Sequence, residues 1–527
     1  MLNEILRSKL PRSVLVISAI VLFCCGSDLK AQTIGDFDTD YGNDGWLELL
    51  EHKGKFSPRE LIAQSDGSLL VTGQYNHGPG VSSFAAVKLL KEGVVDDKYG
   101  TGGYVITPID SFQDAVVCAI GGADGSYYIG GSTEDAQGNT EWAIVKHLKD
   151  GTLDEDFGSK GILKGIYEGI REILTLKQLS DGSIMAMGAA SDNLSFHLGL
   201  FRFSSNGVMD SSFGDDGKLS INLGDEGSFG LDFEVAKDGS VTIIGESTQF
   251  SNSDPIILRY TSDGIKDSGF GNDGRVLFTP QSDASFNDLH LNDDGSLTIS
   301  AFAVSVEGDR DIAVVKFTKD GAPDETFGTD GMSMVRASEN LDVARDLIVL
   351  PNDEILVVGY SWIWGASDIV LALFNSEGKL KSEFGDEGAI LFDHYGSNTL
   401  VSHMIMNSNG EVYVLGNYFE LQTGIPIIAK IVTGFEVSVM SAERPGAISV
   451  FPNPATNIIQ IELAQLNAYS VSIKLVDLQG REVASSAGIT SANGALSYQL
   501  PVGLDNGLYQ LVVTSDKGIW STPIIKE

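Results

Sequence analysis

Cysteine is nearly absent from this sequence. Only three of its 527 residues are cysteines, and two of them, Cys24 and Cys25, lie in an apolar segment near the N-terminus. If that segment is removed on export, Cys118 is the only cysteine left, and a disulfide within the chain is excluded. The fold must then be stabilised by side-chain packing rather than by covalent cross-links.

Basic side chains are also scarce. Lysine and arginine together number 35 against 72 aspartates and glutamates, which gives a net charge of −37. Without residues 1–31, which hold four basic and two acidic side chains, the net charge is −39. A protein this acidic repels nucleic acid and anionic membranes, and it favours solubility and cation binding. We therefore expect no nucleic-acid partner.

The linear signatures of common enzymes are missing as well. The sequence contains no His-Glu-x-x-His, Gly-x-Ser-x-Gly, phosphate-binding P-loop or dinucleotide-binding glycine motif. Its seven histidines, at positions 52, 77, 147, 197, 290, 394 and 403, show no spacing typical of metal ligands. We expect no catalytic residue and no cofactor, although a site assembled from several repeats would leave no linear trace.

The apolar run near the N-terminus is too short to span a bilayer. Residues 14–25 form a largely apolar run of 12 residues that follows Arg7, Lys9 and Arg12. A basic segment followed by a short apolar run is typical of a secretory signal peptide. We predict a signal peptide over residues 1–31, with an uncleaved anchor as the alternative, and no transmembrane segment in the mature chain.

An aromatic–glycine pair recurs along most of the chain at intervals of 56 to 58 residues, each followed three residues later by a second glycine. The seven pairs are Tyr41-Gly42, Tyr99-Gly100, Phe157-Gly158, Phe213-Gly214, Phe270-Gly271, Phe327-Gly328 and Phe384-Gly385. A fixed period of this length indicates one supersecondary unit stacked many times. We expect each aromatic ring to pack between neighbouring units.

One unit, residues 103–161, shows what is repeated. It holds four short runs with strand character, at 104–109, 114–120, 126–131 and 142–148, and an Asp-Gly hairpin turn between the second and third. The first three joins are short and the link after the fourth run is long, which favours a four-stranded antiparallel sheet. We predict an all-β chain with a seven-bladed β-propeller over residues 33–432. A β-helix is the alternative, but its coils are shorter than 57 residues.

The repeat also resembles a known family. Runs such as Lys149-Asp-Gly-Thr-Leu-Asp-Glu-Asp-Phe-Gly158 are similar to the delta-60 repeats of secreted bacterial proteins, and the similarity covers roughly residues 33–432. The resemblance implies a repeat architecture and an exported protein, and it implies little about activity.

Five units carry a basic residue followed eight positions later by aspartate. These pairs are Lys88 and Asp96, Lys146 and Asp154, Arg202 and Asp210, Arg259 and Asp267, and Lys316 and Asp324. In the sixth unit both members are replaced together, by Leu373 and Lys381, which favours direct contact between them. Two members are left over, Lys430 at the end of the repeats and Asp38 before the first. A closed ring predicts that these two meet.

The loops expected on one face of the ring vary freely between units, and varied loops on a rigid scaffold are where binding usually resides. Tyr360, Trp362 and Trp364 alternate along one expected strand beside such a loop, so their rings could bind a sugar or a protein partner. Packing against the neighbouring unit is the alternative. The acidic turns of the opposite face offer a possible Ca²⁺ site, although aspartate is also the residue that such turns prefer.

The period stops after residue 432. A connector over residues 433–446 leads into a separate β module over residues 447–527, whose alternation suits an immunoglobulin-like sandwich. Three motifs mark this module: Pro452, Asn453 and Pro454; Asp477, Gly480 and Arg481; and Gly507 with Tyr509. They resemble, in order, the type A C-terminal sorting domain of the type IX secretion system of Bacteroidetes.

That resemblance implies passage through the inner membrane, recognition by the type IX secretion machinery, and release from or attachment to the outer surface of the cell. From the whole sequence we expect a secreted or surface-attached propeller scaffold that binds polysaccharide or protein without catalysis. The alternative is an extracellular polysaccharide lyase or hydrolase whose site lies in the propeller channel.

Overall fold

The structure is a computed structural model. It describes residues 34–526 except 44, 51–53, 111, 192–195, 222–228, 250–251, 280–283, 306–307, 339–340, 364–365, 393–397, 421–422, 434–447, 452–454, 464–469, 477–481, 491–494, 502–503, 505–506 and 516–517. The predicted signal peptide and nearly all of the predicted connector lie outside the described residues. Every named element of the described chain is a β-strand, and no described helix is long and apolar enough to cross a membrane.

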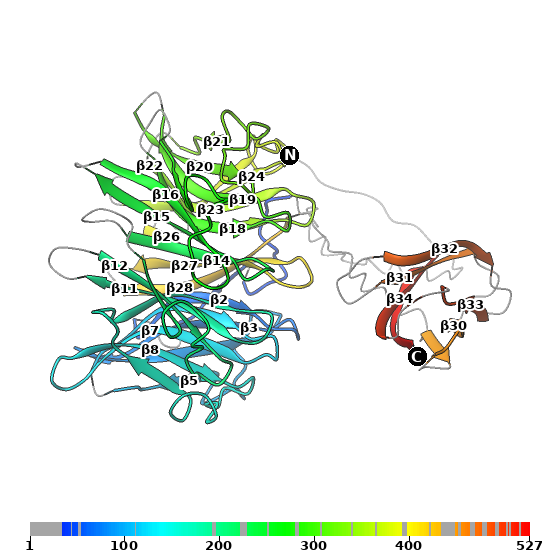
Figure 1. The fold of residues 1–527 in the computed structure, drawn as a ribbon, viewed down its shortest axis with the longest axis horizontal. Coiled ribbons are helices and arrows are strands. Elements are labelled where there is room, and N and C mark those ends of the chain that lie inside the picture. The colour runs from blue at the N-terminus through cyan, green and yellow to red at the C-terminus, as the bar shows by residue number, and fades with distance from the viewer. Residues whose placement is uncertain are drawn as a thin grey trace, which may run out of the picture.

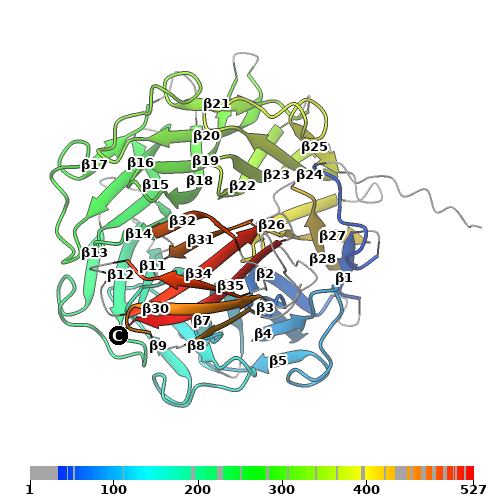
Figure 2. The ribbon, with the colours of Figure 1, turned by 90° about the vertical axis from the view of Figure 1, so that its right-hand side faces the viewer.

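The described strands between residues 46 and 431 form seven four-stranded antiparallel sheets, arranged as the blades of a β-propeller (Figures 1 and 2). Blade 1 contains β2 (Phe56–Ala63), β3 (Leu69–Gly78), β4 (Val81–Leu89) and β5 (Tyr104–Thr107), and blade 2 contains β6 (Asp114–Gly121), β7 (Tyr127–Glu134), β8 (Thr140–His147) and β9 (Ile162–Gly165). Blade 3 contains β10 (Glu172–Gln178), β11 (Ile184–Ser191), β12 (Phe196–Phe203) and β13 (Lys218–Ile221), and blade 4 contains β14 (Phe229–Val235), β15 (Val241–Gln249), β16 (Asn252–Tyr260) and β17 (Arg275–Leu277). Blade 5 contains β18 (Ala284–Leu291), β19 (Leu297–Val304), β20 (Arg310–Phe317) and β21 (Met332–Val335), and blade 6 contains β22 (Leu341–Val349), β23 (Ile355–Ile363), β24 (Ala366–Phe374) and β25 (Ala389–Phe392). Blade 7 contains β26 (Asn398–Met406), β27 (Val412–Glu420), β28 (Thr423–Ile431) and, from the other end of the chain, β1 (Trp46–Glu48).

The first strand of each blade lies nearest the centre of the ring. Figure 2 shows this for blade 5, where β18 is innermost and β21 is at the periphery. Each of these inner strands contacts the inner strand of the next blade, and β26 contacts β2, so the series is closed. The hydrophobic core lies between the blades, because each cluster of buried side chains contains residues from two neighbouring sheets.

The aromatic–glycine pair is part of this packing, as expected. Tyr99, for example, is buried among side chains of blades 1 and 2. Gly100 has a φ of +55°, and a Cβ at this position would approach the carbonyl oxygen of Tyr104 to 2.2 Å. Only glycine fits so close a turn with a left-handed backbone, which explains why the pair recurs.

The N-terminal strand completes blade 7. β1 pairs antiparallel with β28, with Trp46 opposite Ala429, and occupies the outer position of that sheet. The predicted contact is confirmed, because Lys430 Nζ lies 2.8 Å from Asp38 Oδ2. A strand from one end of the chain therefore closes a sheet built from the other end of the repeats.

The repeated charge pair is only partly confirmed. Lys146 and Asp154 form an ion pair at 2.7 Å, and Arg202 and Asp210 form one at 3.1 Å. Lys88 instead contacts Asp66 at 3.6 Å. In two other blades the cation lies over the aromatic ring of the link, with Arg259 above Phe270 and Lys316 above Phe327. In the sixth unit Lys381 contacts Glu354 and Glu383 instead.

One expectation about strand order is wrong. The run at 104–109 was expected to share a sheet with the run at 114–120, but β5 pairs with β4, with Tyr104 opposite Val87, and is the outer strand of the preceding blade. The reason lies in the long link. It folds back along β4, where Asp96 N–H donates to the carbonyl of Lys88, and so returns the chain to the same sheet.

The C-terminal module is a separate pair of sheets. One contains β29 (Ile448–Phe451), β30 (Ile458–Leu463) and β33 (Ala495–Gln499), and the other contains β31 (Ser470–Val476), β32 (Glu482–Thr490), β34 (Gly507–Ser515) and β35 (Gly518–Lys526). Both sheets contribute to one core, with Ile461 and Leu496 from the first and Ile473 and Leu511 from the second.

Candidate functional site

A β-bulge interrupts every inner strand at the same place, and the residue after the bulge forms a ring around the propeller axis. The seven bulges lie before Glu60, Cys118, Thr175, Asp232, Asp288, Asp346 and His403. We call these seven residues the axial ring. They are spaced 56 to 58 residues apart. A bulge re-aims the side chain beside it, so the repeat delivers seven side chains to one level of the axis.

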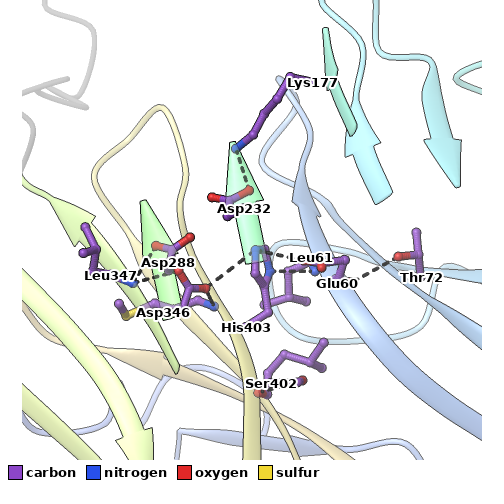
Figure 3. Close-up of polar contacts among 12 residues, drawn as sticks. Glu60, Leu61, Thr72, Lys177, Asp232, Asp288, Asp346, Leu347, Ser402 and His403 are labelled. Carbon is purple, nitrogen blue, oxygen red and sulfur yellow. Dashed lines mark hydrogen bonds and ion pairs between the residues drawn. The ribbon is translucent and has the colours of Figure 1, made fainter. Parts of the chain in front are cut away.

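The acidic part of the ring connects neighbouring blades through the backbone. An Asp288 carboxylate oxygen accepts a hydrogen bond from Leu347 N–H at 3.2 Å, and an Asp346 oxygen accepts one from Met404 N–H at 2.6 Å. His403 Nδ1 accepts from Leu61 N–H at 3.1 Å in the same way (Figure 3). An inner strand has no partner strand on its axial side, so these side chains satisfy backbone donors that would otherwise be unpaired.

His403 lies between two carboxylates. Its Nε2 is 2.9 Å from Glu60 and 3.7 Å from Asp346. Burial alone lowers the pKa of this imidazole, but Glu60 and Asp346 outweigh that effect and raise the pKa to about 9. The hydrogen bond from Leu61 requires an unprotonated Nδ1 and therefore opposes the change, at a cost of about 1 kcal/mol. Attraction to two nearby carboxylates is the larger effect.

Asp288 and Asp346 form a carboxyl pair. Burial, reinforced by Asp346 and Asp232, raises the pKa of Asp288 well above its ordinary value. Burial also raises the pKa of Asp346, whereas His403 and the N–H of Met404 favour its ionised form. Asp288 is therefore the protonated member and Asp346 the carboxylate, since two adjacent carboxylates cannot both ionise at low cost.

A second polar cluster lies two residues further along the inner strands. Lys177 Nζ contacts a Glu234 oxygen at 2.6 Å and an Asp232 oxygen at 3.9 Å. Burial by itself lowers the pKa of Lys177, but these two carboxylates outweigh it and raise the pKa. The equivalent positions of blades 1 and 2 are Ile62 and Ile120. One side of the axis is therefore charged at this level and the other is apolar.

The Lys177 cluster borders a cavity of about 800 Å³ at the end of the axis where the Asp-Gly turns lie. We call it the turn-side cavity. Its lining is Ala63, Ile120, Gly121, Gly122, Ala123, Lys177, Gln178, Leu179, Ser180, Asp181, Arg202, Glu234, Val235, Ala236, Lys237, Asp238, Gly239 and Ser262. These residues belong to blades 1 to 4, mostly to the ends of their inner strands and the turns that follow.

The aromatic residues singled out in the sequence lie toward the opposite face. Tyr360 and Trp362 both belong to β23, and Trp364 lies outside the described residues. Tyr360 is partly buried against the core of blades 6 and 7, with the Arg345 guanidinium 5.2 Å from its ring centre. Trp362 is 47% exposed. The two described rings therefore differ, since Tyr360 is partly buried and Trp362 faces solvent.

The carboxylates of the acidic turns mostly accept hydrogen bonds from residues of the same turn. Asp66 Oδ1, for example, accepts a hydrogen bond from Ser68 N–H at 3.0 Å. Within the residues that the structure describes, no group of three or more His, Cys, Asp or Glu side chains is placed to hold a metal ion. Ca²⁺ binding stays a prediction from sequence.

The sorting-module motifs fall mostly on positions that the structure does not describe. Pro452, Asn453, Pro454, Asp477, Gly480 and Arg481 lie outside the described residues. Gly507 begins β34, and Tyr509 of the same strand, which lies opposite Ile524 of β35, is buried in the core of the module. Tyr509 therefore has a packing role.

Sequence reasoning missed the axial ring. Its members differ in residue type from blade to blade, so no single motif repeats. An alignment of the seven units by position would have shown polar or small side chains at one point of every inner strand.

Comparisons with known proteins agree with this architecture. Residues 449–527 match the family model of a secretion system C-terminal sorting domain. Five segments, 64–97, 122–157, 179–213, 236–270 and 293–327, match a domain of unknown function (DUF5122) β-propeller. No curated protein sequence matches the chain significantly.

Solved structures show only a distant likeness. Polysaccharide lyase Uly1 has a TM-score of 0.43 at 10% identity, covering 78% of this chain and 94% of the lyase. A subtype N10 neuraminidase-like protein of A/little yellow-shouldered bat/Guatemala/060/2010 has a TM-score of 0.32 at 9% identity, with coverages of 73% and 98%. The soluble aldose sugar dehydrogenase of Escherichia coli has a TM-score of 0.31 at 10% identity, also with coverages of 73% and 98%. Likenesses this weak carry no argument about activity.

The repeats, the propeller sheets and the family matches agree. The chain carries repeats of the DUF5122 β-propeller family and ends in a secretion system C-terminal sorting domain, so it is a protein exported through the type IX secretion system.

Proposed function

We propose that the chain is an exported binding scaffold that holds a polysaccharide or a protein, without catalysis, on the face opposite the Asp-Gly turns. The observation that supports this most directly is Trp362, a large aromatic side chain that is 47% exposed beside the hairpin joining β23 and β24. Exposed tryptophans on rigid frameworks supply large, ordered contact areas to sugars and proteins.

The chemistry at the axis supports a non-catalytic role. Asp288 and Asp346 each accept a hydrogen bond from the backbone of the next blade. Side chains fixed in this way hold the blades together, and a catalytic acid or base would need a free position toward a substrate.

The proposal is tested by screening the purified mature chain on arrays of glycans and of surface proteins. We expect Trp362→Ala to weaken binding of the ligand found at least tenfold, with the melting temperature unchanged. Phe112→Ala is the matched control, because Phe112 is 43% exposed on the same face near blades 1 and 2. Equal loss in both variants, or no loss in either, would count against a site at Trp362.

A second candidate function is a polysaccharide lyase or hydrolase with its site at the axis. What favours it is the buried pair of Asp288 and Asp346, because burial raises the pKa of Asp288 well above its ordinary value while His403 and Met404 N–H favour the ionised form of Asp346, and an acid and a base with separated pKa values suit general acid–base chemistry. Turnover of a polysaccharide by the purified chain, abolished in Asp346→Asn, would establish this candidate and displace the first.

A further inference from the structure

The size of the turn-side cavity suits a small ligand rather than an internal segment of a polymer. Its volume of about 800 Å³ lies within the range of small-molecule sites. Ala63, Gly121, Gly122 and Ala123 line blades 1 and 2, where side chains are small enough to leave the space open. Lys177 and Glu234 border it on blades 3 and 4.

The charges around this cavity are balanced. Three of the lining residues are cationic, namely Lys177, Arg202 and Lys237, and three are anionic, namely Asp181, Glu234 and Asp238. They are largely paired with one another or with neighbours. Lys177 contacts Glu234 at 2.6 Å, and Arg202 contacts Asp181 at 3.2 Å. A ligand with net charge would have to compete with one member of each pair, whereas a neutral ligand would not.

Adjacent donors and acceptors are what a sugar requires. A carboxylate accepts a hydrogen bond from one hydroxyl, and the ammonium beside it donates to the oxygen of the next. Lys177 and Glu234 present this arrangement at the wall of the cavity. No aromatic side chain is among the lining residues that the structure describes, which disfavours nucleobases and other flat ligands that bind by stacking.

An unsatisfied acceptor lies just beyond the same wall. Asp232 is only 8% exposed, and its Oδ2 atom has no hydrogen-bond partner among the described residues. Its other oxygen accepts from Thr175 Oγ1 at 3.4 Å. The same oxygen lies 3.9 Å from Lys177 Nζ, a contact drawn in Figure 3. A buried carboxylate oxygen without a partner is costly, and a hydroxyl group or a bridging water would satisfy it.

We propose that the turn-side cavity binds the neutral, polyhydroxylated end of a saccharide, with Lys177 and Glu234 as the residues that recognise neighbouring hydroxyl groups. This site is on the face opposite Trp362 and is independent of the binding proposed there. Its small residues on blades 1 and 2 provide the space, and its paired charges on blades 3 and 4 provide the polar contacts.

The experiment is calorimetric titration of the mature chain with defined probes. Cellotetraose, laminaritetraose, xylotetraose and mannotetraose are the neutral probes, tetragalacturonate is the acidic probe, and tetra-alanine is the peptide probe. We expect at least one neutral probe to bind. We expect Ala123→Trp, which fills the cavity from an exposed turn position, to weaken that binding at least tenfold.

Three variants make the result specific. Ser408→Trp is the matched control, because Ser408 occupies the same exposed turn position in blade 7 and does not line the cavity. We expect Ser408→Trp to bind the neutral probe as the unmodified chain does, and Trp362→Ala reports which of the two faces holds the probe. Glu234→Gln keeps the shape of the side chain and is expected to weaken binding five- to twentyfold.

The proposal is overturned if no neutral probe binds, or if only tetragalacturonate or tetra-alanine binds. It is overturned equally if Ala123→Trp and Ser408→Trp behave alike. Loss of binding in Trp362→Ala but not in Ala123→Trp would refute the cavity and support the face at Trp362, so the two proposals fail separately.

Discussion

Lys430 lies 2.8 Å from Asp38, and its backbone N–H donates to the carbonyl of Gly45, so the last strand of the repeats is fixed to the first segment of the described chain. Lys430 also contacts Glu411 at 2.7 Å. Both partners of the closing pair are mostly buried, with side-chain exposures of 17% and 20%. The pair therefore reports directly on closure of the ring.

Removing that pair should cost a modest amount of stability. We expect Asp38→Asn to lower the free energy of unfolding by about 1 kcal/mol, because Lys430 keeps its contact with Glu411. Chemical denaturation measures the change. Asp97→Asn makes the same change of charge at an exposed site of blade 1 and is expected to have no effect. Equal losses would show that net charge, rather than closure, is responsible.

The pKa of His403 predicts how stability depends on pH. A folded-state pKa of about 9, above the unfolded value of 6.5, means that the contribution is fully present below pH 6.5 and lost as the pH rises to 9. The shift corresponds to about 3 kcal/mol, and losing the Leu61 hydrogen bond on protonation removes about 1 kcal/mol. We expect unfolding free energy to fall by about 2 kcal/mol between pH 6.5 and 9, and His403→Gln to flatten the curve. If the unfolding free energy of the unmodified chain does not change between pH 6.5 and 9, the His403 imidazole is neutral in the folded state.

Removing the charge of Asp346 should destabilise the fold less than removing both of its carboxylate oxygens. Asp346→Leu leaves Met404 N–H without an acceptor and His403 without one of its carboxylates, so we expect a loss of about 3 kcal/mol. Asp346→Asn retains an oxygen for Met404 and should cost about 1 kcal/mol. Urea denaturation of both variants gives the comparison. A larger loss in the asparagine variant would contradict the role of the backbone bond.

Cys118 should be chemically protected. Its thiol is 5% exposed, and burial, aided by nearby Glu60 and Glu172, raises its pKa well above the ordinary value. The thiolate is the reactive form, so we expect alkylation by iodoacetamide at pH 8 to be at least a hundredfold slower in the folded chain than in guanidinium chloride. Mass spectrometry of the peptide that contains Cys118 gives both rates. Rapid labelling of the folded chain would mean that the axial ring opens.

The sorting module should be sufficient for export. A reporter fused to residues 433–527 and supplied with a signal peptide should leave a cell that has the type IX machinery, and the same reporter without these residues should stay in the periplasm. Fractionation of the culture distinguishes the two outcomes. Periplasmic retention of both fusions would contradict recognition of this module alone.

Much of the fold follows from the sequence because it depends on local chemistry. The turn at Asp66-Gly67 needs a positive φ, and the link at Tyr99-Gly100 needs both a positive φ and close packing, which few residues satisfy. The sheet to which residues 104–107 belong cannot be predicted from local chemistry in this way. It depends on whether the preceding link folds back along β4, through backbone bonds that any sequence can form.

The axial ring and the turn-side cavity are harder to foresee. Glu60, Cys118 and Thr175 have no chemistry in common, and they share a level only because each follows a bulge. The cavity exists because blades 1 and 2 have Ala63 and Gly121 where other blades have larger side chains. Neither feature corresponds to a sequence motif, and each can be recognised only when the repeats are compared position by position.

The pairing of Trp46 with Ala429 joins positions 383 residues apart. No intermediate length of chain can form this pair, because the partner strand has not yet been synthesised or translocated when the N-terminal segment emerges. Loop-closure entropy makes so distant a contact slow to form. Until residue 431 has arrived, β1 lacks its partner β28 and presents an open strand edge, which a chaperone or the β28 segment of another chain could occupy.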